Sequence, residues 1–144
     1  MGREAATMSR IVLHGRKVIG GYTEGEALVT KDQMCGFGGL DITTGVIIDK
    51  HHELCGQSIA GKILVIPGAK GSSSFSVYFH YARLNGVGPK AILYNVTTSK
   101  MAMGAIVSHV PAMTDFDSDP LTSIDTGDWV TVDADNGIVE ITKK

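Results

Sequence analysis

The sequence predicts an α/β domain with a β/β/α arrangement, barrel-like or layered, built around a central strand–loop–helix–strand crossover and ending in a β-hairpin. A short, mostly β-branched run at 63–66 predicts a strand buried on both faces. Apolar residues recur at helical spacing over 75–84, and a second apolar run follows at 90–94. A crossover of this length is right-handed, so we expect its two strands to run parallel.

The two ends of the chain predict β-structure. Alternating residues at 129–133 and 138–142 flank Asp135-Asn136-Gly137, which is typical of a hairpin turn. The first thirty residues contain short extended segments separated by glycines. These segments lie at 11–13, 18–19 and 26–30.

The intervening stretches predict shorter elements. They are an irregular loop at 31–45, a strand at 46–48, a helix at 97–104 capped by Thr98 or Ser99, extended pieces at 105–107 and 110–113, and a solvated acidic turn at 115–119. We therefore expect one domain over 9–144, preceded by a disordered start at 1–8.

Composition excludes several classes of function. The net charge is −2 and the basic residues do not cluster, so electrostatic capture of nucleic acid or of an anionic membrane is not expected. The sequence contains neither a signal-peptide pattern nor an apolar run approaching a membrane span, which favours the cytoplasm. Cys35 and Cys55 do not form a Cys-x-x-Cys pair, so we expect no metal site on this chain alone.

The loop at 68–74 is the first candidate site. A glycine-serine loop between a strand and a helix places backbone N–H groups and the positive helix end together, which favours an anion. Lys70 adds a positive charge, and the residues that follow carry hydroxyls that can bind a ligand or take part in proton transfer. The alternative is that one serine caps the helix while the others fill a solvated turn. The loop is not a Walker motif, because Gly71 is followed by serine rather than lysine.

The loop containing Phe37, Gly38 and Gly39 is the second candidate site. Its glycines let the backbone approach another part of the chain, a ligand or a partner surface. A plain turn before the next strand explains the same residues equally well.

Several separated blocks resemble one known family. They are Gly15 to Gly21 with Glu24-Gly25-Glu26, then Phe37 to Asp41, Gly56 to Leu64, Lys70-Gly71-Ser72, Gly104-Ala105-Ile106 and Asp133 to Gly137. In this order they resemble the small subunit, or swivel domain, of aconitase X, over nearly the whole chain from Ile11 onward.

The resemblance implies a swivelling β/β/α domain that closes over a large catalytic subunit and completes a dehydratase (hydro-lyase) site, inactive without that partner. It implies that Ser72 is the base. From the residues of the loop we further expect Lys70 and the backbone from Gly71 to Ser74, including Ser73, to hold the substrate, with Ser76 in support. The iron or iron–sulfur cluster is expected in the large subunit, with none bound by this chain.

The substrate implied by the resemblance is a small hydroxy acid. Cis-3-hydroxy-L-proline is preferred, because a phosphorylated substrate needs more positive charge than Lys70 with the scattered Lys62 or Arg83 provides. Phosphomevalonate is the alternative. A non-catalytic anion-binding or regulatory module is the alternative from another class of function.

Overall fold

The structure is a computed structural model that describes residues 10–69, 74–96 and 98–144. The expected disordered start at 1–8 lies outside the described residues. So do the candidate site residues Lys70, Gly71, Ser72 and Ser73.

The described residues form one eight-stranded sheet and a small number of helices. The strands are β1 (Arg10–His14), β2 (Arg16–Ile19), β3 (Tyr22–Val29), β4 (Ile63–Ile66), β5 (Ala91–Tyr94), β6 (Ala112–Thr114), β7 (Trp129–Asp133) and β8 (Ile138–Thr142). The helices are α2 (Ser74–Leu84), α3 (Ser99–Ser108) and the short α4 (Pro120–Ser123). The strand order is β1-β8-β7-β3-β4-β5-β6-β2.

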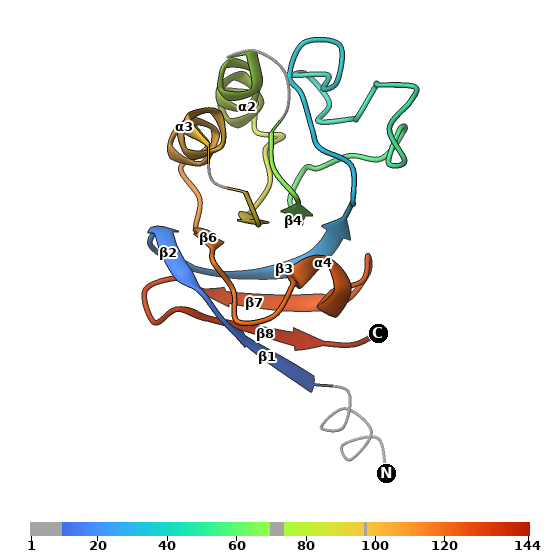
Figure 1. Cartoon of the computed structure of the whole chain (residues 1–144). Coiled ribbons are helices and arrows are strands. Elements are labelled where there is room, and N and C mark those ends of the chain that lie inside the picture. Colours follow the sequence, from blue (N-terminus) through green and yellow to red (C-terminus); the bar gives the residue numbers. More distant parts are fainter. Residues whose placement is uncertain (1–9, 70–73, 97) are drawn as a thin grey trace.

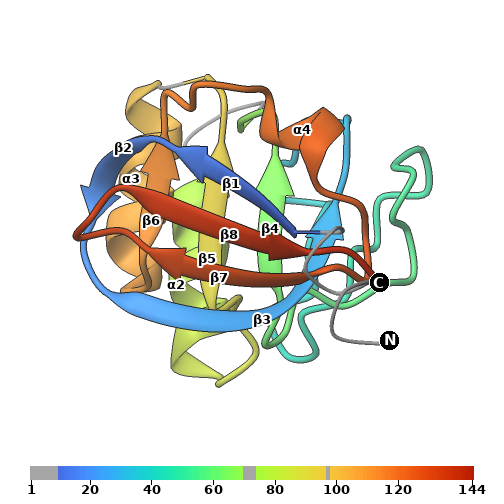
Figure 2. The same ribbon diagram turned by 90° about the horizontal axis from the view of Figure 1, so that it is seen from below.

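Strand β3 joins two different halves of this sheet. Its residues from Tyr22 to Glu26 pair antiparallel with β7, whereas Ala27 to Val29 pair parallel with β4. Strands β1 and β2 end the strand order on opposite sides, yet only Gly15 separates them in sequence, which bends the sheet toward a barrel. Figure 2 shows the antiparallel strands β1, β8 and β7 crossing the parallel strands β4, β5 and β6.

Helices α2 and α3 cover the face of the parallel strands that is turned away from β7 and β8 (Figure 1). The layers are therefore antiparallel sheet, parallel sheet and helices, which confirms the predicted β/β/α class.

The burial of the central strands explains why their sequences are continuously apolar. All residues of β4 and β5 are buried. Leu64 and Ile66 pack in the cluster that contains the helix residue Phe79, whereas Ile63 and Val65 pack in the cluster of the antiparallel layer. A strand with an apolar layer on both sides has no polar face, so its sequence does not alternate.

The crossover and the hairpin are as predicted. Strands β4 and β5 are parallel, and β7 pairs with β8 from Trp129↔Thr142 to Asp133↔Ile138. Gly86 follows α2 with φ +74°, a left-handed conformation that is common just beyond the end of a helix.

Two expectations about local structure are wrong. Residues 105–107 were expected to be extended but belong to α3, which continues to a left-handed C-cap at His109. Ala105 is fully buried in the core cluster of the helix layer, so tertiary packing outweighs the β preference of Ile106 and Val107.

The strand expected at 46–48 is also absent from the sheet. Val46 and Ile47 form only isolated bridges, to Ser58 and Leu40. These residues belong to the long connection between β3 and β4, which lies beside the sheet (Figure 1). Ile47 is buried there, so burial outside the sheet produced the strand-like pattern.

No described helix has the length and apolar character that crossing a bilayer requires.

Candidate functional site at the carboxyl edge of the parallel sheet

The parallel strands direct several connections to one edge of the sheet. Strands β4, β5 and β6 and the second half of β3 share one direction, so their carboxyl ends lie together. Helices α2 and α3 follow β4 and β5 and therefore begin at this edge. Helix N-termini carry unpaired N–H groups and partial positive charge, so the edge favours an anionic ligand.

The start of α3 is fixed by a side-chain cap. The hydroxyl of Thr98 accepts a hydrogen bond from the backbone N–H of Met101 at 3.2 Å, and Thr98 is extended. Of the two caps expected from the sequence, Thr98 is the one observed.

Hydrogen bonds from two other segments of the chain fix the junction between β4 and the loop that follows it. The N–H of Val96 donates to the carbonyl oxygen of Pro67 at 2.9 Å, and the N–H of Met34 donates to that of Gly68 at 3.2 Å. Gly68 and Ala69 are buried, so the chain enters the candidate loop from a fixed position. The roles assigned to Lys70, Gly71, Ser72 and Ser73 concern residues outside the described part of the chain and stay predictions.

The described end of this loop contacts the second candidate segment. The hydroxyl of Ser74, at the first position of α2, accepts a hydrogen bond from the N–H of Phe37 at 3.2 Å. A Cβ placed on Gly36 would lie 2.3 Å from the carbonyl oxygen of Ser74, so only glycine fits there. Ser74 and Ser76 are both half-buried in the first turn of α2. The structure thus brings together two loops that are about forty residues apart in sequence.

The turn at 36–39 has a defined geometry. The N–H groups of Gly39 and Leu40 both donate to the carbonyl oxygen of Gly36, at 3.0 and 3.1 Å. Gly38 has φ +75°, a conformation that favours glycine. The Phe37 ring is 77% exposed and meets the Tyr78 ring edge-on, with centroids 6.4 Å apart.

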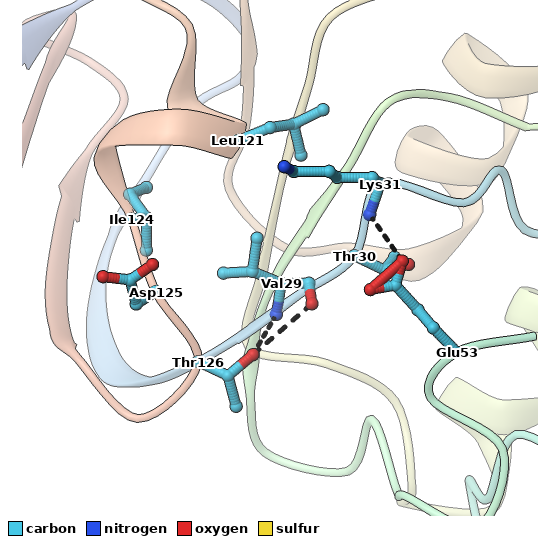
Figure 3. A pocket seen from close by; sticks show the side chains of 8 residues that line it. All are labelled: Val29, Thr30, Lys31, Glu53, Leu121, Ile124, Asp125 and Thr126. Atoms are coloured by element: carbon cyan, nitrogen blue, oxygen red, sulfur yellow. Dashed lines mark hydrogen bonds between the residues drawn. The ribbon is translucent and has the colours of Figure 1, made fainter.

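Two hollows open at the same edge, and no local pattern in the sequence predicts either of them. One, of about 170 Å³, lies where β3 ends and is shown in Figure 3. It is lined by Val29, Thr30, Lys31, Glu53, Leu121, Ile124, Asp125 and Thr126. The hydroxyl of Thr126 accepts from the N–H of Val29 at 2.9 Å, which joins the strand end to the segment after α4. Lys31 is balanced in this hollow by Glu53 and Asp125, so its lining carries no excess of positive charge.

The second hollow, of about 340 Å³, follows β5 and β6 and is acidic. It is lined by Asn95 and the residues from Asp115 to Pro120. The N–H of His14 donates to Asp117 and, against the effect of burial, holds the pKa of that carboxyl below its ordinary value. Asp119 caps α4 and accepts from the Asn95 amide at 3.0 Å. Because these carboxylates repel an anion, the starts of α2 and α3 are the part of this edge that favours an anionic ligand.

The part of the chain that the structure describes contains no group of three or more His, Cys, Asp or Glu side chains that could hold a metal ion. Cys35 is half-buried and Cys55 is exposed, and both are free thiols.

Comparison with known proteins yields one consistent family. The family model of the aconitase X swivel domain matches residues 12–141. A phosphomevalonate dehydratase small subunit from Thermococcus kodakarensis is 42% identical over 129 residues, covering 90% of this chain and 95% of that protein. One from Archaeoglobus fulgidus is 43% identical over 126 residues, covering 88% and 95%. The crystal structure of aconitase X from Thermococcus kodakaraensis in its holo-form matches with a TM-score of 0.85 at 41% identity, covering 92% of this chain and 99% of that one.

Proposed function

Because the chain belongs to the aconitase X swivel-domain family, we propose that it is the small subunit of a phosphomevalonate dehydratase. The single observation that carries this proposal is the match to relatives of that name along almost their whole length, as in the 95% of the Thermococcus kodakarensis protein that is covered. A small subunit implies a large catalytic partner, so the site described above is one side of an active site.

The choice of substrate differs from the sequence-based preference. Cis-3-hydroxy-L-proline was preferred because this chain offers little positive charge, whereas the relatives' names favour phosphomevalonate, which was the alternative. The charge argument considered only this chain. Two helix N-termini at one edge add anion affinity that a count of lysines and arginines omits, and the partner can supply further cations.

The proposed chemistry is the loss of water from neighbouring carbons. Ser72 removes a proton from one carbon, and hydroxide leaves the next carbon as the double bond forms. A serine hydroxyl is a weak base, so its alkoxide needs N–H donors, positive charge and the exclusion of water. The backbone of the loop is assigned the N–H donors and Lys70 the positive charge. Closure against the large subunit excludes water.

The iron or iron–sulfur cluster is proposed to reside in the large subunit, where as a Lewis acid it would bind the departing hydroxyl. Residues of this chain are assigned to proton removal and to substrate orientation.

The test is co-expression of this chain with its candidate large subunit, followed by assays of water loss. We expect the purified complex to dehydrate phosphomevalonate and each subunit alone to be inactive. Turnover of cis-3-hydroxy-L-proline without turnover of phosphomevalonate would reverse the substrate assignment. A stable complex that dehydrates neither compound would favour the non-catalytic module.

A further inference from the structure

Helix α2 exposes apolar side chains on the face opposite its core. Its buried residues are Phe75, Phe79 and Ala82. The outward residues Val77, Tyr81 and Leu84 have i, i+4, i+7 spacing and are 47%, 48% and 58% exposed. A helix that is apolar on both faces is typical of a buried helix, so a surface position requires an explanation.

The helix layer also lacks the charges that normally solvate an exposed helix. Charged residues make up 19% of the chain, but Arg83 and Lys100 are the only Asp, Glu, Lys or Arg in α2 and α3. Arg83 is committed within the layer, because its Nε donates to the carbonyl oxygen of Val107 at 3.1 Å. Met103 and Ile106 of α3 are also exposed apolar side chains, at 53% and 49%.

This surface is continuous with the candidate site. The segment after β3 runs along α2, with Phe37 bonded to Ser74 at the start of the helix and the carbonyl of Ile42 accepting from Asn85 just beyond its end. Phe37, the most exposed large apolar side chain of the described residues, therefore lies at the start of α2, where its ring meets that of Tyr78. Its turn is fixed by hydrogen bonds, so little conformational entropy is lost when a partner covers it.

We propose that Phe37, Val77, Tyr81 and Leu84, termed the α2 surface, bind the large subunit of the dehydratase. The proposal rests on the proposed function, which supplies the existence of that subunit. A chain that completes the site must approach the edge where Phe37 lies, and the apolar stripe leads from there along α2. A second copy of this chain would not have to contact this edge. The large subunit is therefore the better fit to the α2 surface.

The experiment compares charge insertions on two faces of the chain. Val77→Lys and Tyr81→Lys place an ammonium on the α2 surface. Val12→Lys places one on β1, where Val12 is similarly exposed at 45% but lies in the antiparallel layer. All three positions face solvent, so circular dichroism should show melting temperatures close to that of the unchanged chain.

Each variant is co-expressed with the large subunit, and the dissociation constant is measured on purified proteins. We expect Val77→Lys and Tyr81→Lys to weaken binding at least tenfold and Val12→Lys to leave it within twofold. Equal binding by all three variants would overturn the proposal while leaving the proposed function intact. If the unchanged chain neither binds the large subunit nor supports dehydration, the proposed function itself fails.

The molar mass of the isolated protein in solution tests the alternative occupant of the α2 surface, a second copy of this chain. We expect a monomer by light scattering. A dimer that Val77→Lys dissociates, with unaltered binding of the large subunit, would assign the α2 surface to a second copy and overturn the proposal.

Discussion

The backbone N–H of Phe37 donates to the hydroxyl of Ser74 at 3.2 Å, which ties the glycine turn at 36–39 to the first residue of α2. Two segments that the sequence predicted separately as candidate loops thus form one wall of the site edge. This bond and the close packing of Gly36 on Ser74 hold the Phe37 backbone against the start of α2.

We predict that Ser74→Ala loosens the turn while preserving the fold. Loss of this hydrogen bond should lower the free energy of unfolding by about 1 kcal/mol, as is typical for a single partly exposed bond. Hydrogen exchange followed by NMR should show faster exchange of the Phe37 amide, whose acceptor has been removed. Ser118→Ala, at an exposed position in the acidic turn, serves as the control. Unchanged protection of the Phe37 amide in Ser74→Ala would contradict the assigned role.

The sequence was sufficient for the elements whose patterns are local. The apolar runs of β4 and β5, the helical spacing of α2 and the turn between β7 and β8 each follow from neighbouring residues. The layered class follows from them, because a parallel crossover needs helices on the sheet and the terminal strands must cover its other face.

The sequence was insufficient where contacts between residues far apart in the chain determine the local structure. Residues 105–107 are β-branched in part, yet Ala105 packs into the helix layer and the segment is helical. Nothing near Phe37 indicates that its N–H bonds to Ser74. The only local signal was Gly36, whose need for close approach could be inferred without identifying what it approaches. The two hollows at the edge were missed because loops from different strands form each of them.

We predict that Ser72→Ala abolishes dehydration and leaves assembly intact. Removing a general base that has no substitute should lower kcat by about 10² to 10⁴-fold, with little effect on the affinity for the large subunit. Thr142→Ala, at an exposed position in β8, should have normal kcat and serves as the control. Near-normal kcat in Ser72→Ala would remove this serine from the proposed chemistry.

We predict that Gly104→Ala destabilises the helix layer, although alanine is the better helix former. A Cβ at this position would lie 2.2 Å from Cε2 of Phe75. The Phe75 ring cannot move freely, because it stacks on Phe79 with centroids 4.4 Å apart in a fully buried site. Overpacking of roughly 1–3 kcal/mol should exceed the gain in helix propensity of about 1 kcal/mol. Urea unfolding measures the balance, and Gly68→Ala, whose Cβ would meet only contacts of 3.4 Å or more, is the control. A stabilised Gly104→Ala variant would show that the two helices can separate without cost.

The last prediction concerns the carboxyl group of Asp128, which is 1% exposed and lies next to the C-terminal strand. Burial alone would raise the pKa of Asp128. Hydrogen bonds from the Lys143 ammonium at 2.5 Å and from the N–H groups of Asp125 and Lys144 outweigh burial, so this pKa lies below its ordinary value. Burial likewise opposes the charge on Lys143, but its carboxylate partners raise the pKa of Lys143.

A depressed carboxyl pKa gives a definite sign to the pH dependence. The stabilisation is fully present above the unfolded pKa of about 3.9 and is lost as the pH falls through the folded value. The raised pKa of Lys143 makes its contribution complete below about pH 10, so the pair is at full strength between about pH 5 and 9.

Asp128→Asn should therefore lower the free energy of unfolding by about 2–3 kcal/mol at pH 7, less than for a fully enclosed pair because Lys143 remains 25% exposed. The difference from the unchanged chain should shrink below pH 4. Asp115→Asn, which removes an exposed pair with Arg16, should cost less than about 1 kcal/mol. Urea titrations from pH 3 to pH 9 measure both differences. A gap for Asp128→Asn that stays constant down to pH 3 would mean that the lost stability comes from packing rather than from the ionised carboxylate.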